Sequence, residues 1–536
     1  MFRDVGVVEE FEAAVVPAAA EQSRPASLAA RFLPSFTDAA FLVPILFIYA
    51  GLAGAHALLG DGDTGWHIRT GQWMMANGRV PASDPFSFTK PGEPWFAWEW
   101  LWDLAFGWMH AQWGMAAVVL ASTVVIGLTF AALYRLALRK SQNAPAALVV
   151  TLVAAAVASI HCLARPHLLT MLFAVIFYAL LERIQAGQTR LLYWLPPLMV
   201  LWTNLHGGFL AGLLFIAAYA AGEAVAWAAS TARDDRAASL ARLRGYTLAG
   251  AACLAATIVN PYGIKLHQHI YAYLTDPYQY EHIHEFFSLN FQHPMGKFVE
   301  AMIVLGAIAA ARQLYRRQFA YPILFAGWAH LALLSARNIP IYAIAAAPAI
   351  AACLVEAAHM LSGADVPDRL RKMGRRVTEL GREIGQIESI PRVPVATVAG
   401  VVLLGVLLHA QPNEKFRPDY DPKKYPARAI ETLRGPEFAE GVFTDDEWGD
   451  YLIYRLYPRT KVFVDGRSDF YGSKFSLKYL DVMAVKWDWQ KTLDRYRIHT
   501  VLLAVNSPLA GAMKETARWR PVYDDGQAIV FRRAAR

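Results

Sequence analysis

Charged residues and cysteines are both scarce in this sequence. Asp, Glu, Lys and Arg make up 18% of its 536 residues, whereas a soluble globular domain averages about 25%. Hydrophobic residues make up 56%, which excludes a disordered or fibrous chain and argues against an ordinary cytosolic enzyme. The three cysteines, Cys162, Cys253 and Cys353, all lie in apolar runs, which excludes a disulfide framework and a CxxC metal site.

The net charge of +7 suggests a nucleic-acid partner only until the basic residues are placed. Lys and Arg concentrate between apolar segments, where membrane topology explains them better. We therefore expect membrane lipids and no nucleic acid as partners.

Apolar runs recur along residues 38–411. A helix needs about 20 apolar residues to cross a bilayer, and the runs predict about 11 transmembrane helices, several of them short. The first run could instead be a cleavable signal, but we treat it as a retained helix that follows a poorly ordered cytosolic lead, residues 1–37. The predicted spans are 38–59, 113–134, 144–163, 168–184, 191–205, 207–229, 246–260, 298–311, 319–335, 339–361 and 394–411.

The loops between these runs predict the orientation. With the N-terminus inside, the inner loops hold nineteen Lys and Arg residues and the outer loops hold seven. The positive-inside rule therefore favours a cytosolic N-terminus. An odd number of spans then places residues 412–536 outside. In that tail, β-type runs (441–444, 461–465, 500–504 and 528–531) alternate with helical ones such as 447–457, which predicts a small α/β extracytoplasmic domain.

Polar residues gather at the outer ends of the predicted helices. Ionisable groups at membrane depth are costly and so mark functional sites, and a cavity open to the outer face would explain the set together. Capping and snorkelling are the alternative explanation. The residues are Arg165, His167, Asn204, His206, Asn260, Arg337 and Asn338.

The first outer loop, residues 60–112, carries the densest group of candidate side chains. Asp61 and Asp63 lie two residues apart beside Gly62, so both can converge on Mg²⁺, Mn²⁺ or one reacting hydroxyl. The alternative is an Asx turn that caps a helix starting near Trp66. Six of the sixteen tryptophans follow within residues 95–113, which favours an amphipathic helix on the outer leaflet. Glu99 lies among them and is a second candidate acid, base or ligand.

Two arginines and two further segments complete the candidates. Arg165 and Arg337 are suited to a lipid phosphate, although Arg165 could instead pair with an acidic loop residue such as Asp63. The outer loop after Asn260 contains His267, His269, His282 and His284 together with Glu281 and Glu285, which fit a substrate-gating loop better than a metal site. In the tail, residues 445–451 and 465–472 follow β-like runs and suggest a polar acceptor surface or ordinary turns.

The layout resembles the GT-C membrane glycosyltransferases over residues 38–536. Those proteins have many spans, a long first outer loop with an acidic motif at its start, and often a soluble outer C-terminal domain. More closely, the sequence resembles an uncharacterised bacterial group of such proteins, which has a first-loop motif like Asp61–Ile68, a turn like Trp202–Gly208 and a tail motif like Glu447–Leu452 followed by Val464–Arg467. The WWD-type tail motif of the oligosaccharyltransferases is absent from the sequence.

The resemblance implies transfer of a sugar from a polyprenyl-phosphate carrier to a glycan, lipid or protein acceptor. It places the chain in a bacterial cytoplasmic membrane, with the reaction at the outer face. Asp61 or Asp63 would be the catalytic base or the ligand of a divalent cation, because some members use a metal and others a lone carboxylate. Substrate-binding residues would be His67, Glu99, Arg165, His167, Asn204, His206, Arg337 and Asn338.

Two alternatives belong to other functional classes. One is a transporter or ligase for lipid-linked glycans, and the other is a non-catalytic protein of envelope polysaccharide assembly. Transport should also place polar groups on the inner side, where this sequence has few.

Overall fold

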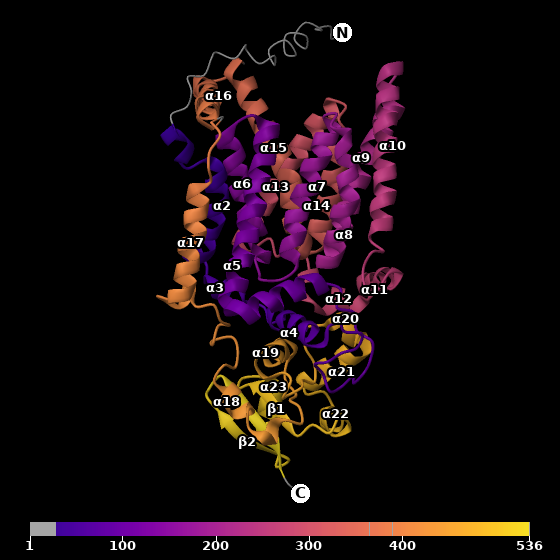
Figure 1. Cartoon of the computed structure of the whole chain (residues 1–536), viewed down its shortest axis with the longest axis vertical. Helices are drawn as coiled ribbons and strands as arrows, with labels where there is room; N and C mark the ends of the chain where they lie inside the picture. Colours follow the sequence, from indigo (N-terminus) through magenta and orange to yellow (C-terminus); the bar gives the residue numbers. More distant parts are fainter. Residues whose placement is uncertain (1–27, 364, 389, 535–536) are drawn as a thin grey trace.

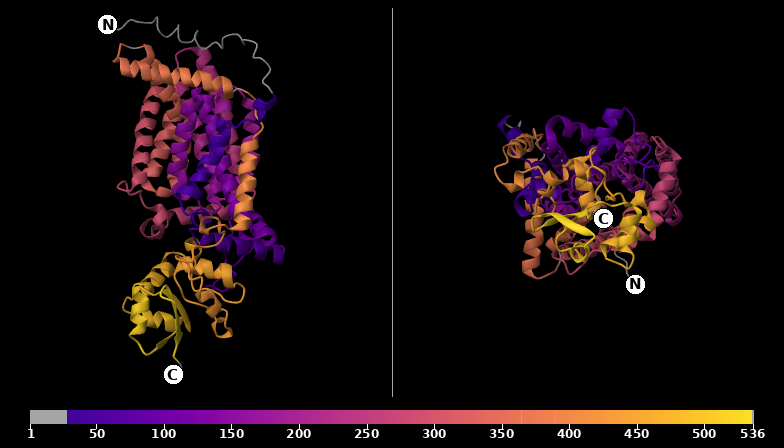
Figure 2. Two further views of the ribbon diagram at one scale, coloured as in Figure 1. Left: turned by 90° about the vertical axis from the view of Figure 1, so that its left-hand side faces the viewer. Right: turned by 90° about the horizontal axis from the view of Figure 1, so that it is seen from below.

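Long apolar helices stand side by side in the computed structural model, which describes residues 28–363, 365–388 and 390–534 (Figure 1). Residues 1–27 of the predicted N-terminal lead lie outside this range. A smaller C-terminal part, which contains the sheet, lies at one end of the bundle, and helix α16 lies across the other end (Figure 2).

The helices of the bundle and its loops follow the chain in order. They are α2 (Phe36–Leu46), α3 (Ala55–Leu58), α4 (Asp63–Asn77), α5 (Trp100–Ser141), α6 (Ala144–Ala158), α7 (His167–Gln185), α8 (Leu195–Leu205), α9 (Leu210–Ala229), α10 (Arg233–Ala256), α11 (Ile264–Thr275), α12 (Pro277–His282), α13 (Pro294–Tyr315), α14 (Ala320–Leu334), α15 (Ile339–Gly363), α16 (Asp368–Glu388) and α17 (Val395–Ala410).

The protein is a membrane protein with a polytopic helical fold. Among the described residues, seven helices are long and apolar enough to cross a membrane, and α14 and α17 are shorter apolar helices. A helix is present at each predicted span, but the number that cross the membrane stays a prediction. Helix α5 contains both the tryptophan-rich segment of the first loop and the span predicted at 113–134. Gly114, with a φ of 71°, forms a kink between these two parts.

Two predicted boundaries were wrong. The first apolar run does not form one helix over residues 38–59, because α2 ends in a π-helical turn (Phe47–Gly51) and Gly54, with a φ of 64°, separates it from α3. Helix α10 begins at Arg233 instead of near residue 246. Its first half is rich in Ala, Arg and Leu, which are strong helix formers despite the charge that suggested a loop.

The C-terminal part is a small α/β unit. It contains α18 (Ala429–Leu433), α19 (Asp446–Leu456), α20 (Ser468–Tyr471), α21 (Ser473–Met483), α22 (Trp489–Arg495), β1 (Thr500–Ala504), α23 (Pro508–Lys514), β2 (Trp519–Asp524) and β3 (Ala528–Arg533). The sheet is antiparallel in the order β1-β3-β2, with Val501 opposite Phe531.

The two earlier predicted strands, 441–444 and 461–465, form only isolated bridges. Val442 pairs with Val462, and Phe443 pairs with Val501 in β1. Val462 also pairs with Ser87 of the first long loop, residues 60–112. Backbone pairing therefore fixes the first loop against the C-terminal part.

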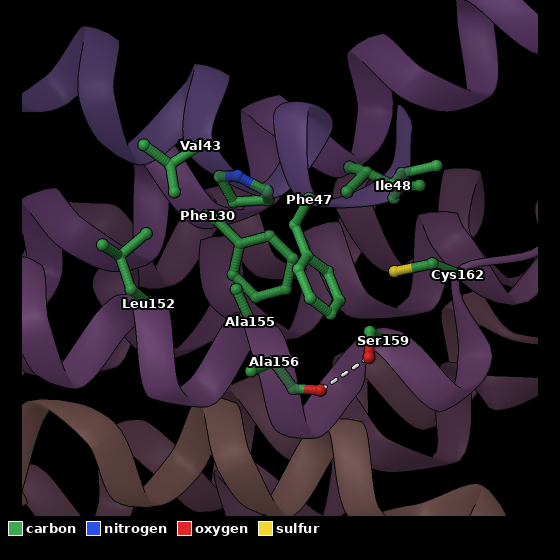
Figure 3. A pocket seen from close by; sticks show the side chains of 11 residues that line it. Val43, Phe47, Ile48, Phe130, Leu152, Ala155, Ala156, Ser159 and Cys162 are labelled. Atoms are coloured by element: carbon green, nitrogen blue, oxygen red, sulfur yellow. Dashed lines mark hydrogen bonds between the residues drawn. The ribbon is translucent and has the colours of Figure 1, made fainter. Parts of the chain in front are cut away.

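An apolar pocket of about 110 Å³ lies within the bundle between α2, α5 and α6 (Figure 3). Phe47, Phe130 and Leu152 line it, and its polar groups are Ser159 and Cys162. No charged side chain among the described residues lines this pocket, so it does not offer acid, base or phosphate-binding chemistry.

Candidate functional site

A polar cavity of about 440 Å³ lies where the bundle, the first long loop (residues 60–112) and the C-terminal part meet. Its wall comes from α4, α7, α11, the start of α15 and the segment 466–469. Eight of the ten candidate residues line it: Asp63, His67, Glu99, Arg165, His167, His206, Arg337 and Asn338. Asp61 and Asn204 are not part of the lining.

Asp61 and Asp63 are positioned by the turn that opens α4. The Asp61 carboxylate accepts a hydrogen bond of 2.9 Å from the Asp63 N–H, which is the Asx turn considered as an alternative. Asp63 is the first residue of α4, and its Oδ1 accepts a hydrogen bond of 3.1 Å from the indole Nε1 of Trp66. Asp61 is therefore a turn residue, and its second carboxylate oxygen contacts the Arg165 guanidinium.

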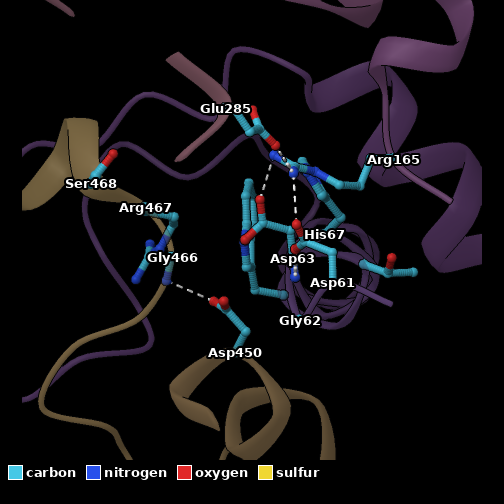
Figure 4. Close-up of polar contacts among 12 residues, drawn as sticks. Asp61, Gly62, Asp63, His67, Arg165, Glu285, Asp450, Gly466, Arg467 and Ser468 are labelled. Carbon is cyan, nitrogen blue, oxygen red and sulfur yellow. Dashed lines mark hydrogen bonds and ion pairs between the residues drawn. The ribbon is translucent and has the colours of Figure 1, made fainter. Parts of the chain in front are cut away.

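The guanidinium of Arg165 lies between three carboxylates (Figure 4). Its nitrogens are 2.8 Å from Asp61, 2.6 Å from Asp63 and 2.7 Å from Glu285. Arg165 therefore pairs with acidic residues, as the alternative interpretation proposed. Its charge balances the cluster and is not free for a substrate phosphate in this arrangement.

Asp450 of α19 faces Asp63 across Gly466 (Figure 4). The Asp450 Oδ1 accepts a hydrogen bond of 2.9 Å from the Gly466 N–H. A Cβ on Gly466 would lie 2.7 Å from the Asp450 Oδ2 and would touch the Asp63 Oδ1. Only glycine therefore leaves room for both carboxylates.

Burial and like charges control the ionisation of this cluster. Burial raises the pKa of Asp63 to about 7, with Arg165 opposing the shift and Asp61 adding to it. Burial and then the neighbouring Asp63 raise the pKa of Asp450 well above its usual range. Burial acts in the same direction on Glu285, but Arg165 and Arg337 outweigh it and lower the pKa of that carboxyl. The site thus combines a carboxylate that titrates near neutrality with one that stays ionised.

Glu99 and His206 form a second polar group in the cavity. The Glu99 Oε1 lies 3.7 Å from the His206 Nε2. Burial, followed by the charge of Asp469, raises the pKa of Glu99 to about 8, so this side chain is mostly protonated at neutral pH. The His206 Nδ1 accepts a hydrogen bond of 3.0 Å from the Gly208 N–H, which leaves Nε2 to carry the ring hydrogen.

Three of the predicted binding residues are fixed by protein contacts. The His67 Nδ1 lies 2.6 Å from the buried Asp103 Oδ1, and the His167 Nε2 lies 2.5 Å from the His161 carbonyl oxygen. Asn204 accepts a hydrogen bond from the indole of Trp100 and donates to two backbone carbonyls. Because its amide is fully used in joining α8 to its neighbours, Asn204 positions the wall and does not face a substrate.

Arg337 differs from Arg165 in its surroundings. Its guanidinium donates a hydrogen bond of 3.3 Å to the Tyr273 hydroxyl and lies 4.4 Å above the ring of Phe286. Within the part of the chain that the structure describes, Arg337 has no ion pair with a carboxylate. Arg337 is therefore the cavity cation whose charge is available to a ligand.

Asp61 and Asp63 do not fit a divalent metal in this arrangement. Their outward oxygens contact the Arg165 guanidinium, which takes the place that a cation would need. No group of three or more His, Cys, Asp or Glu side chains among the described residues is arranged to hold a metal ion. We therefore assign no step of the chemistry to a metal.

Several residues of the site were not among the predicted site residues. Glu285, Asp450, Gly466 and Asp469 join it from segments that lie far from the first loop in sequence. The available signal was the tail motifs 445–451 and 465–472, which follow β-type runs. Spacing alone does not reveal that their carboxylates approach Asp63.

The comparisons with known proteins identify a fold. No protein-family model matches the chain, and no curated protein matches its sequence. The apo oligosaccharyltransferase of Archaeoglobus fulgidus is similar in structure, with a TM-score of 0.56 and 11% identity over 88% of this chain and 69% of that chain. The oligosaccharyltransferase AglB from the same organism, in complex with an inhibitory peptide and a dolichol-phosphate, has a TM-score of 0.54 and 11% identity over 93% and 74% of the two chains.

A third solved structure is more distant. ArnT from Cupriavidus metallidurans, bound to undecaprenyl phosphate, has a TM-score of 0.47 and 14% identity over 92% of this chain and 97% of that chain, which is too distant to infer a shared fold. At these identities the likeness to the A. fulgidus enzyme concerns the fold alone. The chain therefore has a GT-C-like membrane fold with a small C-terminal α/β unit.

Proposed function

We propose that this protein is a GT-C-type glycosyltransferase. It moves a sugar from a polyprenyl-phosphate-linked donor to a glycan, lipid or protein acceptor at the outer face of a bacterial cytoplasmic membrane. The observation that carries the proposal is the division of charge in the cavity. Arg337 provides a cation without a carboxylate partner, while Asp63 and Glu99 provide carboxyl groups that titrate near neutral pH.

The donor phosphate would bind Arg337. A guanidinium can bind a phosphate in a bidentate fork, and burial beside Phe286 strengthens the interaction because water is excluded. Arg165 cannot take this role without giving up its three carboxylates. The fold of AglB, whose structure contains a dolichol-phosphate and a peptide, supports a lipid phosphate as donor and a separate acceptor.

The acceptor hydroxyl would lie at Asp63. Its oxygen attacks the anomeric carbon of the donor sugar with inversion, and the bond from that carbon to the phosphate oxygen breaks. The electron pair leaves on the phosphate, where Arg337 balances the charge, and the hydroxyl proton passes to the Asp63 carboxylate. A base with a pKa of about 7 is well matched to this step, because about half of it is ionised at neutral pH and it binds the transferred proton more tightly than an ordinary carboxylate does.

The first experiment uses the purified protein in nanodiscs with a panel of polyprenyl-phosphate sugars and acceptors. We expect release of polyprenyl phosphate by the wild type and a loss of about 100-fold or more in Asp63→Asn, the range for general-base removal. Arg337→Gln should mainly raise the KM for the donor.

The matched control is Arg312→Gln, which removes an arginine that pairs with Glu356, away from the cavity. It should leave transfer unchanged. Donor binding without turnover by the wild type, for every donor and acceptor, would contradict the transferase and favour a transporter or an assembly protein.

A further inference from the structure

Helix α16 crosses one end of the bundle and buries few of its own residues there. It lies at the end away from the C-terminal part, and its buried residues are Gly374 and Gly381 (Figures 1 and 2). A Cβ on Gly374 would lie 2.5 Å from the Ala358 carbonyl oxygen in α15, and one on Gly381 would touch the Asn143 side chain. Two glycines thus allow the backbone of α16 to contact the ends of the spanning helices.

Hydrogen bonds fix the height of α16 along the bundle. The side-chain amide of Asn143, the residue that caps α6, donates to the Val377 carbonyl oxygen at 3.2 Å. The Glu388 carboxylate accepts a hydrogen bond of 3.1 Å from the Phe36 N–H at the start of α2. Helix α16 therefore lies where α2 and α6 begin and α15 ends, which is the level at which the hydrocarbon of a bilayer gives way to head groups.

An apolar stripe on α16 is about half exposed. Leu370 is 41% exposed, Met373 is 53% exposed and Leu380 is 44% exposed, and Val377 and Ile387 extend the same stripe. In chain order the stripe runs through residues 370, 373, 377, 380 and 387. This spacing places the five side chains on one side of a helix. Exposed apolar side chains at this level are suited to the boundary between acyl chains and head groups.

The rest of the exposed surface of α16 is mainly basic in its first half. Five of its six basic residues come before Val377, where Asp368 is the only acidic residue. Asp368 pairs with Arg371, and the other acidic residues of the helix are Glu379, Glu383 and Glu388. The basic residues are Arg369, Arg371, Lys372, Arg375, Arg376 and Arg382.

We propose that α16 is an interfacial helix that binds anionic phospholipids. Its apolar stripe enters the acyl boundary, and the basic residues of its first half contact phosphate head groups. Charge alone would also suit an acidic protein. The fixed position at the ends of the spanning helices favours lipid, because the bilayer around the bundle brings acyl chains and head groups to the level of the apolar stripe. This proposal does not depend on the transferase activity.

The test compares full-length protein in nanodiscs of phosphatidylcholine and of phosphatidylcholine with phosphatidylglycerol. Native mass spectrometry counts the lipids that stay bound to wild type, to Arg369→Gln/Arg371→Gln/Lys372→Gln/Arg375→Gln and to a control. The control, Lys474→Gln/Lys486→Gln/Lys491→Gln/Arg497→Gln, removes the same charge from exposed residues of the C-terminal part. We expect the α16 variant to lose at least half of the excess phosphatidylglycerol and the control to keep it.

A second measurement does not depend on charge. A spin label at residue 373, in a variant whose native cysteines are replaced by Ala, should be accessible to oxygen and shielded from a water-soluble nickel reagent. A label at residue 372 should show the reverse, and unchanged melting temperatures would show that both variants fold. Equal lipid retention in all three proteins, or a water-accessible label at residue 373, would overturn the proposal and favour a protein partner.

Discussion

The protonation of Asp63 depends on a balance between burial and the charges around it. Burial raises its pKa to about 7, Arg165 opposes this, and Asp61 and Glu285 add to it. Since the carboxylate must be ionised to accept a proton, transfer should increase as the pH rises through about 7 and fall as the pH drops below it. Asp61 raises the pKa of Asp63 through its negative charge. An asparagine at this position removes the charge but keeps a side-chain oxygen that accepts the hydrogen bond of the turn.

We therefore expect Asp61→Asn to move the acidic limb of the pH profile to lower pH. Removing one negative charge lowers the pKa of Asp63, by up to about one pH unit for a charge at this range. The measurement is kcat/KM for polyprenyl-phosphate release between pH 5 and 9. Asp524→Asn, at an exposed position in β2, is the control and should not move the limb. A limb that stays in place in Asp61→Asn would show that Asp63 is not the titrating base.

At the scale of elements, the close crossing of α4 and α5 positions the first loop. Gly71 and Gly107 lie at the crossing, where a Cβ on Gly107 would lie 2.7 Å from the Gly71 Cα. A Cβ on Gly71 would overlap the Asp103 carbonyl group. Because Asp63 and His67 lie on α4 and Asp103 on α5, this crossing also sets the distance between His67 and Asp103.

Gly71→Ala should separate the two helices and lower both stability and activity. Overpacking at a rigid backbone contact costs about 1–3 kcal/mol, so we expect a lower melting temperature together with a reduced transfer rate. Gly327→Ala in α14 is the matched control, because no atom lies within 4 Å of a Cβ placed there. Wild-type stability and activity in Gly71→Ala would mean that the crossing tolerates a methyl group and does not position the site.

Element-scale features were also the most predictable from the sequence. Apolar runs identified the positions of the bundle helices, and residues 500–504 form β1 as predicted. The start of α10 was missed because charge was taken to indicate a loop, whereas Arg, Ala and Leu favour a helix. The strands predicted at 441–444 and 461–465 form only bridges. Residue 443 alone pairs with β1, and residue 462 alone pairs with residue 442 and with the first loop.

At the scale of the whole molecule, the site exists only where distant segments meet. The sequence indicated Asp61, Asp63 and Arg165 separately, and an ion pair with Arg165 was one of two open interpretations. It did not indicate that Glu285, 120 residues further on, would complete the cluster, or that Asp450 would face Asp63. Such contacts depend on tertiary packing, which local pattern and propensity do not encode.

The same assembly argues that transfer is independent of divalent metal. The first loop supplies Asp61 and Asp63, the loop before α13 supplies Glu285, and the turn before α7 supplies the cation, Arg165, that contacts all three. A resident guanidinium therefore already provides the positive charge that a metal would bring to these carboxylates. Treatment with EDTA, followed by addition of Mg²⁺ or Mn²⁺, should leave the rate of polyprenyl-phosphate release unchanged. A loss of activity in EDTA that Mn²⁺ restores would show that the carboxylates leave Arg165 to bind metal during turnover.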